Sequence, residues 1–225
     1  MADNHHFQKP LTQRTFQKGL SILTRNDPDL AKIVVDFGPP PFWNRKPGFT
    51  TLVHIILEQQ VSLASARAVL NKLMHAVSPL TPKKFLEQDD KTLKTFGFSR
   101  QKTAYCRNFA ELITTGQLDL KQLNSKNDEQ VRRTLTEVKG IGRWTANIYL
   151  LMALRRPDIW PVGDLALESA IQKLKNLPAR PRSDESKNIA ADWKPWRAVA
   201  ARILWHYYLS NGRDREPSQK PVCSL

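Results

Sequence analysis

Hydrophobic residues recur along this chain at spacings of three and four, and no segment alternates apolar and polar residues as a half-buried strand would. Such spacing gathers apolar side chains on one face of a helix. We therefore predict an all-α protein. Helices are expected at residues 11–24, 29–37, 50–61, 62–77, from Thr81-Pro82, 90–97, 99–115, 127–138, 143–154, 164–175 and 196–210.

Glycine and proline divide these helices. Residues 38–48 (GPPPFWNRKPG) contain four prolines. Because proline lacks a backbone N–H donor and fixes φ, a loop is expected there. Residues 177–194 are polar and contain prolines, and we predict a second loop there. The two ends, residues 1–10 and 217–225, are expected to be mobile tails.

The charge balance points to an anionic partner. Lysine and arginine total 35 against 21 acidic residues, which gives a net charge of +14, and the pI is about 10.0. This is the footprint of a nucleic-acid binder, although a solvated basic surface gives the same composition. Two cysteines, Cys106 and Cys223, cannot supply the four thiolates of an iron–sulfur cluster. His5 and His6 are interpreted as part of the mobile tail, not as metal ligands.

The chain has no long apolar run and no charged-then-apolar leader. We therefore expect a soluble intracellular protein that does not bind membranes. The expected place is the cytoplasm, associated with the nucleoid, if the host is bacterial, or the nucleus if it is eukaryotic. A monomer is expected.

A Gly-Ile-Gly turn, Gly140 to Gly142, joins two helical segments. Two glycines permit positive φ and close approach to another surface. The N–H groups at the start of the following helix lack intrahelical partners, and such a helix terminus suits a phosphate. Arg143 adds a charge and Thr145 a hydroxyl. A turn that only packs is the alternative, and a Gly-x-Gly alone favours it.

Asp164 follows Val-Gly and is predicted to be the N-cap of the next helix. A carboxylate there is stabilised in its ionised form by the helix dipole. A fixed carboxylate can stabilise a developing cation or orient a water. Glu168 lies four residues on, so a carboxylate pair is open, but we interpret it as a solvated helix residue. The aromatic residues Trp144, Trp205 and Tyr207, with a basic surface, permit a pocket that stacks a base.

Five segments together resemble the helix-hairpin-helix superfamily of DNA base-excision glycosylases, and specifically the DNA-3-methyladenine glycosylase II family. They are residues 138–147 (VKGIGRWTAN), 161–164 (PVGD), 56–62 (ILEQQVS), 97–102 (GFSRQK) and 194–197 (KPWR), the last leading into 203–205. The resemblance implies a two-lobed helical fold with the active site in the cleft between the lobes. The central lobe would be residues 49–163, with the helix-hairpin-helix at about 127–154, and the second lobe 11–48 plus 164–211.

The resemblance also implies roles for single residues. Asp164 matches the catalytic aspartate, and Trp144 stands where strand-cutting members place a lysine nucleophile. The base pocket would comprise Trp144, Trp205, Tyr149 and Tyr207, whereas Ile148 stands where some relatives have an aromatic residue. The DNA contacts would comprise Gly140, Gly142, Arg143, Thr145 and, where a leucine wedge is usual, Phe98 or Arg100. No cofactor is required, but the carbonyls of Thr136, Val138 and Ile141 match those that bind a structural Na⁺ or K⁺.

The function that the resemblance implies is a monofunctional DNA glycosylase. It would flip alkylated purines, of the 3-methyladenine and 7-methylguanine type, out of double-stranded DNA and hydrolyse the N-glycosidic bond. A non-catalytic helix-hairpin-helix module that binds distorted DNA is the alternative. A bifunctional glycosylase/lyase is a third reading, and Trp144 argues against it because an indole cannot form a Schiff base.

Overall fold

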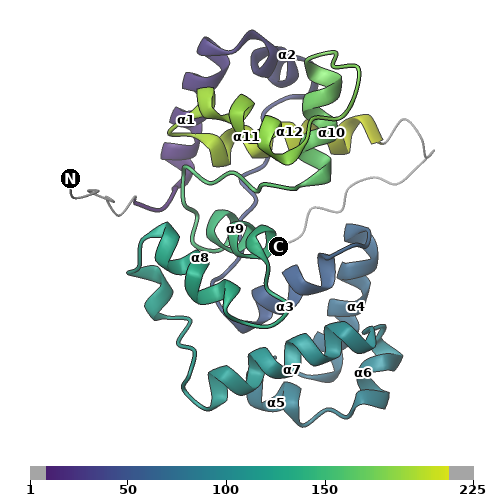
Figure 1. Ribbon diagram of the computed structural model, residues 1–225. Coiled ribbons are helices and arrows are strands. Elements are labelled where there is room, and N and C mark those ends of the chain that lie inside the picture. The colour runs from purple at the N-terminus through teal and green to yellow at the C-terminus, as the bar shows by residue number, and fades with distance from the viewer. Residues whose placement is uncertain (1–8, 213–225) are drawn as a thin grey trace. The chain divides into compact units, whose positions relative to one another are not determined.

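The computed structural model describes residues 9–212, and all the regular structure in that range is helical (Figure 1). The prediction of an all-α protein is therefore confirmed. The elements are α1 (Gln13–Asn26), α2 (Pro28–Phe37), α3 (Phe49–Glu58), α4 (Leu63–Ala76), α5 (Pro82–Leu86), α6 (Asp90–Phe96), α7 (Arg100–Thr114), η1 (Gln122–Asn124), α8 (Asp128–Thr136), α9 (Arg143–Met152), α10 (Leu165–Leu174), α11 (Ser183–Ile189), η2 (Ala190–Trp193) and α12 (Arg197–Gly212).

Polar side chains set where most of these helices begin. In each case the side-chain oxygen of the residue before the helix accepts a hydrogen bond from a backbone N–H of the first turn, which is worth about 1 kcal/mol. The capping residues are Thr12, Asp27, Ser62, Thr81, Asp89, Ser99, Asn127 and Asp164. The caps predicted at Thr81, Ser99 and Asp164 are confirmed.

One predicted loop is wrong. Residues 177–194 contain α11 and η2. The residue before α11 is Arg182, which is not a usual capping type, although the Glu185 side chain accepts a hydrogen bond from its N–H. The helix buries Ser186 and no large apolar side chain, so its sequence carries no apolar stripe. Polar composition and nearby prolines concealed it.

The chain divides into two compact units. Within the described residues, unit 1 is residues 44–156 together with Lys9 and Pro10, and unit 2 is residues 11–43 and 157–212. Unit 2 is thus built from two distant parts of the sequence, with junctions at Trp43–Asn44 and Arg156–Pro157. The predicted tails 1–10 and 217–225, with His5, His6 and Cys223, lie largely or wholly outside the described residues.

Helix α3 is central to unit 1, where it packs against α4, α7 and α9. Its residue Phe49 lies between the rings of Phe85 and Phe109, with centroid distances of 5.8 and 5.3 Å. All three phenylalanines are buried. Burying an aromatic ring of this size contributes about 2–3 kcal/mol, so this cluster is a main source of stability in unit 1 and fixes the start of α3.

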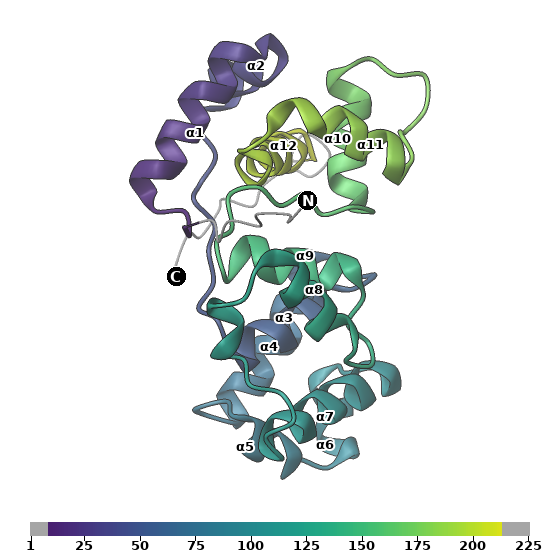
Figure 2. The ribbon, with the colours of Figure 1, turned by 60° about the vertical axis from the view of Figure 1, so that its left-hand side comes forward.

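Helix α12 is central to unit 2, where it contacts α1, α2 and α10 (Figures 1 and 2). The guanidinium of Arg202 is fully buried and donates to the Trp43 carbonyl at 2.9 Å. It also lies 5.4 Å from the centre of the Phe42 ring and 6.0 Å from that of Phe16. Burial lowers the pKa of Arg202 to about 9. The proline-rich segment is therefore anchored to α12.

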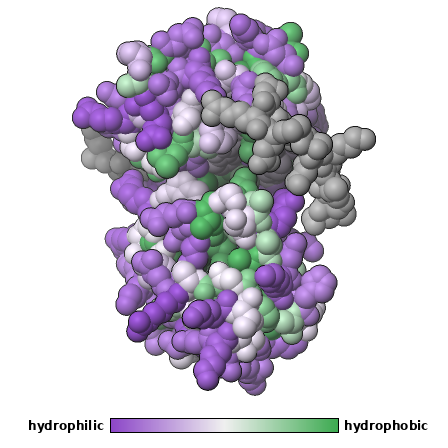
Figure 3. Space-filling view, turned by 90° about the vertical axis from the view of Figure 1, so that its right-hand side faces the viewer, coloured by the Kyte–Doolittle hydropathy of each residue, from purple (hydrophilic) through white to green (hydrophobic). Residues whose placement is uncertain are grey.

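Hydrophilic side chains cover most of the face shown in Figure 3, with smaller hydrophobic areas between them. Among the described residues, large apolar side chains that remain exposed include Val35, Val61, Leu63, Met74 and Leu165. No helix in residues 9–212 has both the length and the apolar character needed to cross a membrane.

Candidate active site

The turn between α8 and α9 depends on Gly140. Its φ is +88°, a conformation that favours glycine. A Cβ built at this position would overlap the ring of Tyr105, which lies directly against the turn. Gly142 differs, because its φ of −87° suits any residue and a Cβ there would meet nothing within 4 Å. The expectation of positive φ holds for Gly140 and is wrong for Gly142.

Gln59 ties the turn to the end of α3. Its amide nitrogen donates to the Gly140 carbonyl and to the Thr145 hydroxyl, both at 3.0 Å. Thr145 is only 1% exposed, so the expectation that its hydroxyl contacts a phosphate is wrong. Gln59 is a residue that the sequence did not single out. Its position in the ILEQQVS segment was the available signal.

The end of α3 before Gln59 is fixed by a charged cluster. The Arg45 guanidinium binds the Glu58 carboxylate with two hydrogen bonds, of 2.6 and 3.0 Å. His54 lies beside them, with its ring nitrogen 3.4 Å from Glu58. Burial, and then the charge of Arg45, lower the pKa of His54 to about 4. His54 is therefore neutral at pH 7.

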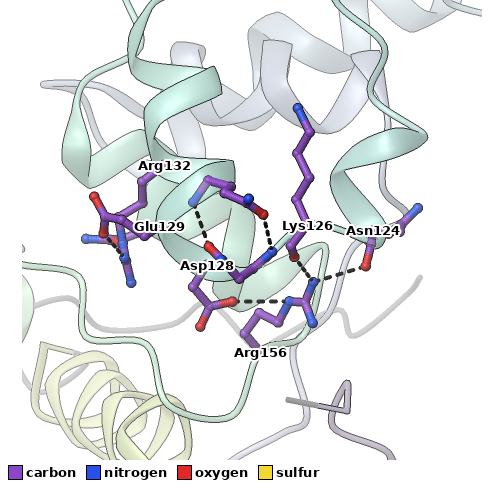
Figure 4. A network of polar contacts seen from close by, with 9 residues as sticks. Asn124, Lys126, Asp128, Glu129, Arg132 and Arg156 are labelled. Atoms are coloured by element: carbon purple, nitrogen blue, oxygen red, sulfur yellow. Dashed lines mark hydrogen bonds and ion pairs between the residues drawn. The ribbon is translucent and has the colours of Figure 1, made fainter. Parts of the chain in front are cut away.

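The end of the α8–α9 hairpin that is opposite to the Gly140 turn is held by the buried Arg156 (Figure 4). Arg156 donates to the carbonyls of Asn124 and Lys126, at 3.1 and 2.9 Å, and forms an ion pair with Asp128. Arg156 is 1% exposed. These contacts join the segment that follows α9 to the start of α8. A second link, from Arg132 on α8 to the Asn147 amide oxygen on α9, spans 2.9 Å.

The N-terminus of α9 faces solvent. Gly142 and Arg143 are both exposed. Since Gly142 has no side chain, it cannot cap α9 as Thr, Ser, Asp and Asn cap eight of the other helices. The first N–H groups of a helix carry a partial positive charge, and with Arg143 beside them they suit an anion such as a phosphate.

Asp164 occupies the N-terminus of α10 in unit 2. Its Oδ1 accepts hydrogen bonds from the N–H groups of Ala166 and Leu167, at 3.1 and 3.0 Å. The same oxygen accepts one from the Trp205 indole at 3.2 Å. The carboxylate is 7% exposed. A buried anion is thus held by three donors, and Trp205, 41 residues away in sequence, is brought against it.

Glu168 is not the solvated residue that we expected. It is 4% exposed and its Oε1 accepts a hydrogen bond of 2.9 Å from the Ser183 hydroxyl. Its Oε2 lies 3.9 Å from the Arg180 guanidinium. The interpretation failed because the loop predicted over residues 177–194 is partly helical and covers this side of α10.

The family model described as "HhH-GPD superfamily base excision DNA repair protein" matches residues 53–196. This range includes the hairpin, Gln59 and Asp164. The chain belongs to the HhH-GPD superfamily.

Individual HhH-GPD relatives are similar over most of the chain. DNA-3-methyladenine glycosylase 1 of Schizosaccharomyces pombe is 29% identical over 83% of this chain and 83% of its own length. Putative DNA-3-methyladenine glycosylase YfjP of Bacillus subtilis is 27% identical over 70% of this chain, and the match spans 58% of that protein. A solved structure of the S. pombe 3-methyladenine DNA glycosylase Mag1 with abasic DNA has a TM-score of 0.77, at 26% identity, covering 84% of this chain and 95% of that one.

The four aromatic residues expected in the base pocket of this HhH-GPD protein have different environments. Trp144 and Trp205 are half-buried, and Tyr207 is half-buried with its ring edge-on to Phe37. Tyr149 is fully buried, accepts a hydrogen bond from the Gly48 N–H at 3.1 Å, and has its pKa raised to about 12 by burial. Tyr149 is therefore a core residue, and its assignment to the pocket is wrong.

The two residues expected to fill the gap left by the flipped base, Phe98 and Arg100, also differ in their exposure to solvent. Phe98 is 4% exposed and its ring lies 5.9 Å from that of Phe85, so it belongs to the core and does not reach a DNA surface. Arg100 is exposed at the start of α7. The exposed apolar residues of unit 1 nearest in sequence to Gln59 are Val61 and Leu63, at 46% and 55%. Neither Val61, within the 56–62 segment, nor Leu63, just after it, was singled out from the sequence.

The hairpin carbonyls expected to bind a monovalent cation lie at the end of α8 and in the turn before α9. Carbonyl oxygens are suitable ligands for Na⁺ or K⁺. The Val138 carbonyl accepts one hydrogen bond, from the Ile141 N–H at 3.0 Å, and a carbonyl has a second lone pair. The cation site at Thr136, Val138 and Ile141 stays a prediction.

Proposed function

We propose that this protein is a monofunctional DNA glycosylase that hydrolyses the N-glycosidic bond of alkylated purines, of the 3-methyladenine and 7-methylguanine type. The observation that carries the proposal is the buried carboxylate of Asp164, held by two backbone N–H groups and the Trp205 indole. Similar proteins that bear the name DNA-3-methyladenine glycosylase support the substrate class.

The enzyme does not need to activate the leaving base strongly. Methylation at N3 of adenine or N7 of guanine makes the purine cationic, so it leaves without strong protonation. Positive charge then develops on the sugar, and a fixed carboxylate stabilises it and positions the attacking water. Asp164 supplies that carboxylate. Because its three donors hold it before the reaction, no reorganisation is needed when the charge develops.

The extruded base needs a surface to stack on. Flipping a nucleotide costs a few kcal/mol, and least for a damaged base. The indole of Trp205 offers a π face to a cationic purine, worth about 0.5–2 kcal/mol, and Tyr207 is a further aromatic residue on α12. Trp144, on α9, stays a predicted contact of the base. A neutral purine gains less from these faces, which favours alkylated bases.

Strand cleavage by a lyase step needs an amine that attacks the sugar. Trp144 lies on α9, two residues after Gly142, and its indole cannot form a Schiff base. Lys139 is exposed, but it precedes Gly140 on the other side of the turn. We therefore propose hydrolysis alone, and borohydride should trap no covalent adduct with DNA.

We propose that unit 1 holds the DNA backbone. Gly142, Arg143 and the first N–H groups of α9 would bind a phosphate, and Arg100 would add a charge. The exposed α3–α4 turn, with Val61 and Leu63, would contact the duplex. Gln59 links that turn to the hairpin, so both would meet the DNA as one rigid surface. The protein would act as a monomer on double-stranded DNA.

Chromatography of the bases freed from methylated DNA tests the function directly. We expect 3-methyladenine or 7-methylguanine to be released by the native protein. Asp164→Asn should lower release at least about 100-fold, by analogy with the loss of one charge-stabilising group, while DNA affinity stays nearly the same. Asp36→Asn, at an exposed position of α2, is the matched control. Binding without release by the native protein would instead identify a non-catalytic DNA-binding module.

A further inference from the structure

One face of α11 contacts the chain on both sides of Asp164. Ser183 and Ser186 are three residues apart, so they share a face of the helix. The Ser183 hydroxyl donates to Glu168, which follows Asp164 in the chain. The Ser186 hydroxyl accepts a hydrogen bond of 3.2 Å from the indole of Trp160, which precedes Asp164. A short helix therefore bridges the segments that enter and leave the candidate catalytic position.

Ser183 also lies close to the turn that precedes Asp164. Gly163 has a φ of +82°, and a Cβ built on it would lie 3.7 Å from the Ser183 Oγ. The turn is closed by a hydrogen bond of 3.2 Å from the Asp164 N–H to the Pro161 carbonyl. The Ser183 Oγ thus lies near this turn while its hydroxyl donates to Glu168 on α10.

Glu168 is a buried carboxylate that the proposed mechanism does not use. Burying a charge is costly unless it has partners, and here the partners are Ser183 and, at a longer distance, Arg180. The Glu168 N–H donates to the Asp164 carbonyl at 3.0 Å, so one helical turn separates them. Glu168 is therefore joined to the start of α10 by a backbone hydrogen bond.

We propose that Glu168 is a positioning residue. Through its hydrogen bond with Ser183, it holds α11 against residues 161–163 and thereby sets the place of the Asp164 carboxylate beside Trp205. This role rests on the function proposed for Asp164. It matters for the rate because a displacement of about 1 Å of a reacting group costs about 100-fold.

Single-turnover kinetics of base release test the proposal. We expect Glu168→Gln and Ser183→Ala each to lower the rate constant about tenfold, with DNA affinity and Tm close to those of the native protein. Ser183→Thr keeps the hydroxyl and should restore most of the rate. Ser21→Ala on α1 and Glu111→Gln on α7, both at exposed positions, are the matched controls and should not change the rate.

A second measurement does not depend on activity. In protein labelled with ¹⁵N-tryptophan, the Trp205 indole N–H signal, assigned with Trp205→Phe, reports its hydrogen bond to Asp164. Ser183→Ala and Glu168→Gln should shift this signal, and Ser21→Ala should not. Unchanged rates and an unshifted signal would overturn the positioning role, and so would a rate loss matched by equal losses of Tm and DNA affinity. If the native protein releases no base while the signal shifts, the positioning role stands and the proposed function fails.

Discussion

The N-termini of α9 and α10 differ in how their first backbone N–H groups are bound. Helix α9 begins at an exposed glycine that cannot cap it, so its N–H groups suit an anion that comes from outside. Helix α10 begins at Asp164, whose own buried carboxylate accepts two of those N–H bonds. The start of α9 has no side-chain cap, whereas the start of α10 is capped by a buried carboxylate.

The turns before α9 and α10 are also supported differently. Gly140 is locked by its backbone conformation, by the Tyr105 ring and by Gln59. The turn before Asp164 is supported by side-chain hydrogen bonds from α11 and α12, which come later in the chain. A substitution of Gly140 should therefore change stability, whereas one around the second turn should change the rate of reaction.

The largest expected effect is that of Gly140→Ala. An L-residue at this φ costs about 1–2 kcal/mol, and overlap with the Tyr105 ring adds about 1–3 kcal/mol. The free energy of unfolding should fall by about 3 kcal/mol, measured by urea denaturation. A loss below about 0.5 kcal/mol would show that the turn rearranges freely, and the contrast between the two turns would then fail.

The next effect is a pH dependence in unit 1. The pKa of His54 is about 4 in the folded protein and 6.5 ordinarily. Between these values the unfolded chain binds a proton that the folded protein does not, so stability is present above pH 6.5 and is lost as the pH falls towards 4. We expect a loss of about 2 kcal/mol, reduced by partial solvent exposure. Urea melts from pH 7 to 4 measure it, and His54→Gln should remove this part of the slope.

Trp205→Phe is expected to act on the rate. Phenylalanine keeps an aromatic ring but removes the indole N–H that reaches Asp164 at 3.2 Å. A hydrogen bond to a charged group contributes about 1.5–3 kcal/mol, so base release should slow by at least about tenfold. Trp193→Phe would be a poor control because its N–H binds Asp27. Trp196→Phe is the better comparison, and equal losses in both variants would argue against a specific role.

The smallest effect on stability is expected for Gly142→Ala. Its φ is ordinary and its Cβ position is open, so unfolding should change by less than about 0.5 kcal/mol. DNA affinity should nevertheless fall several-fold, because the added methyl group stands where a phosphate would approach. Fluorescence anisotropy with a labelled duplex measures it. Unchanged affinity would show that DNA does not approach α9 at this residue.

Local features of the fold were predictable from the sequence because they depend on neighbouring residues. Ser99 and Asp164 were identified as caps, and Gly97, with a φ of +108°, ends α6 as predicted. Helix α11 was not predictable, since it buries Ser186 and lacks an apolar stripe. The burial of Phe98 and Tyr149 was also out of reach, because a core phenylalanine and a surface wedge have the same sequence signal.

The candidate site shows the same division. The chemical types of Asp164, Trp205 and the hairpin glycines were legible in the sequence, because charge, aromaticity and backbone freedom belong to single residues. The hydrogen bonds within the site join residues up to 86 positions apart. Trp205 donates to Asp164, Gln59 donates to both Gly140 and Thr145, and Ser183 donates to Glu168. Such pairings arise only when distant helices pack together. The tertiary structure alone therefore decided which of these groups act on one another.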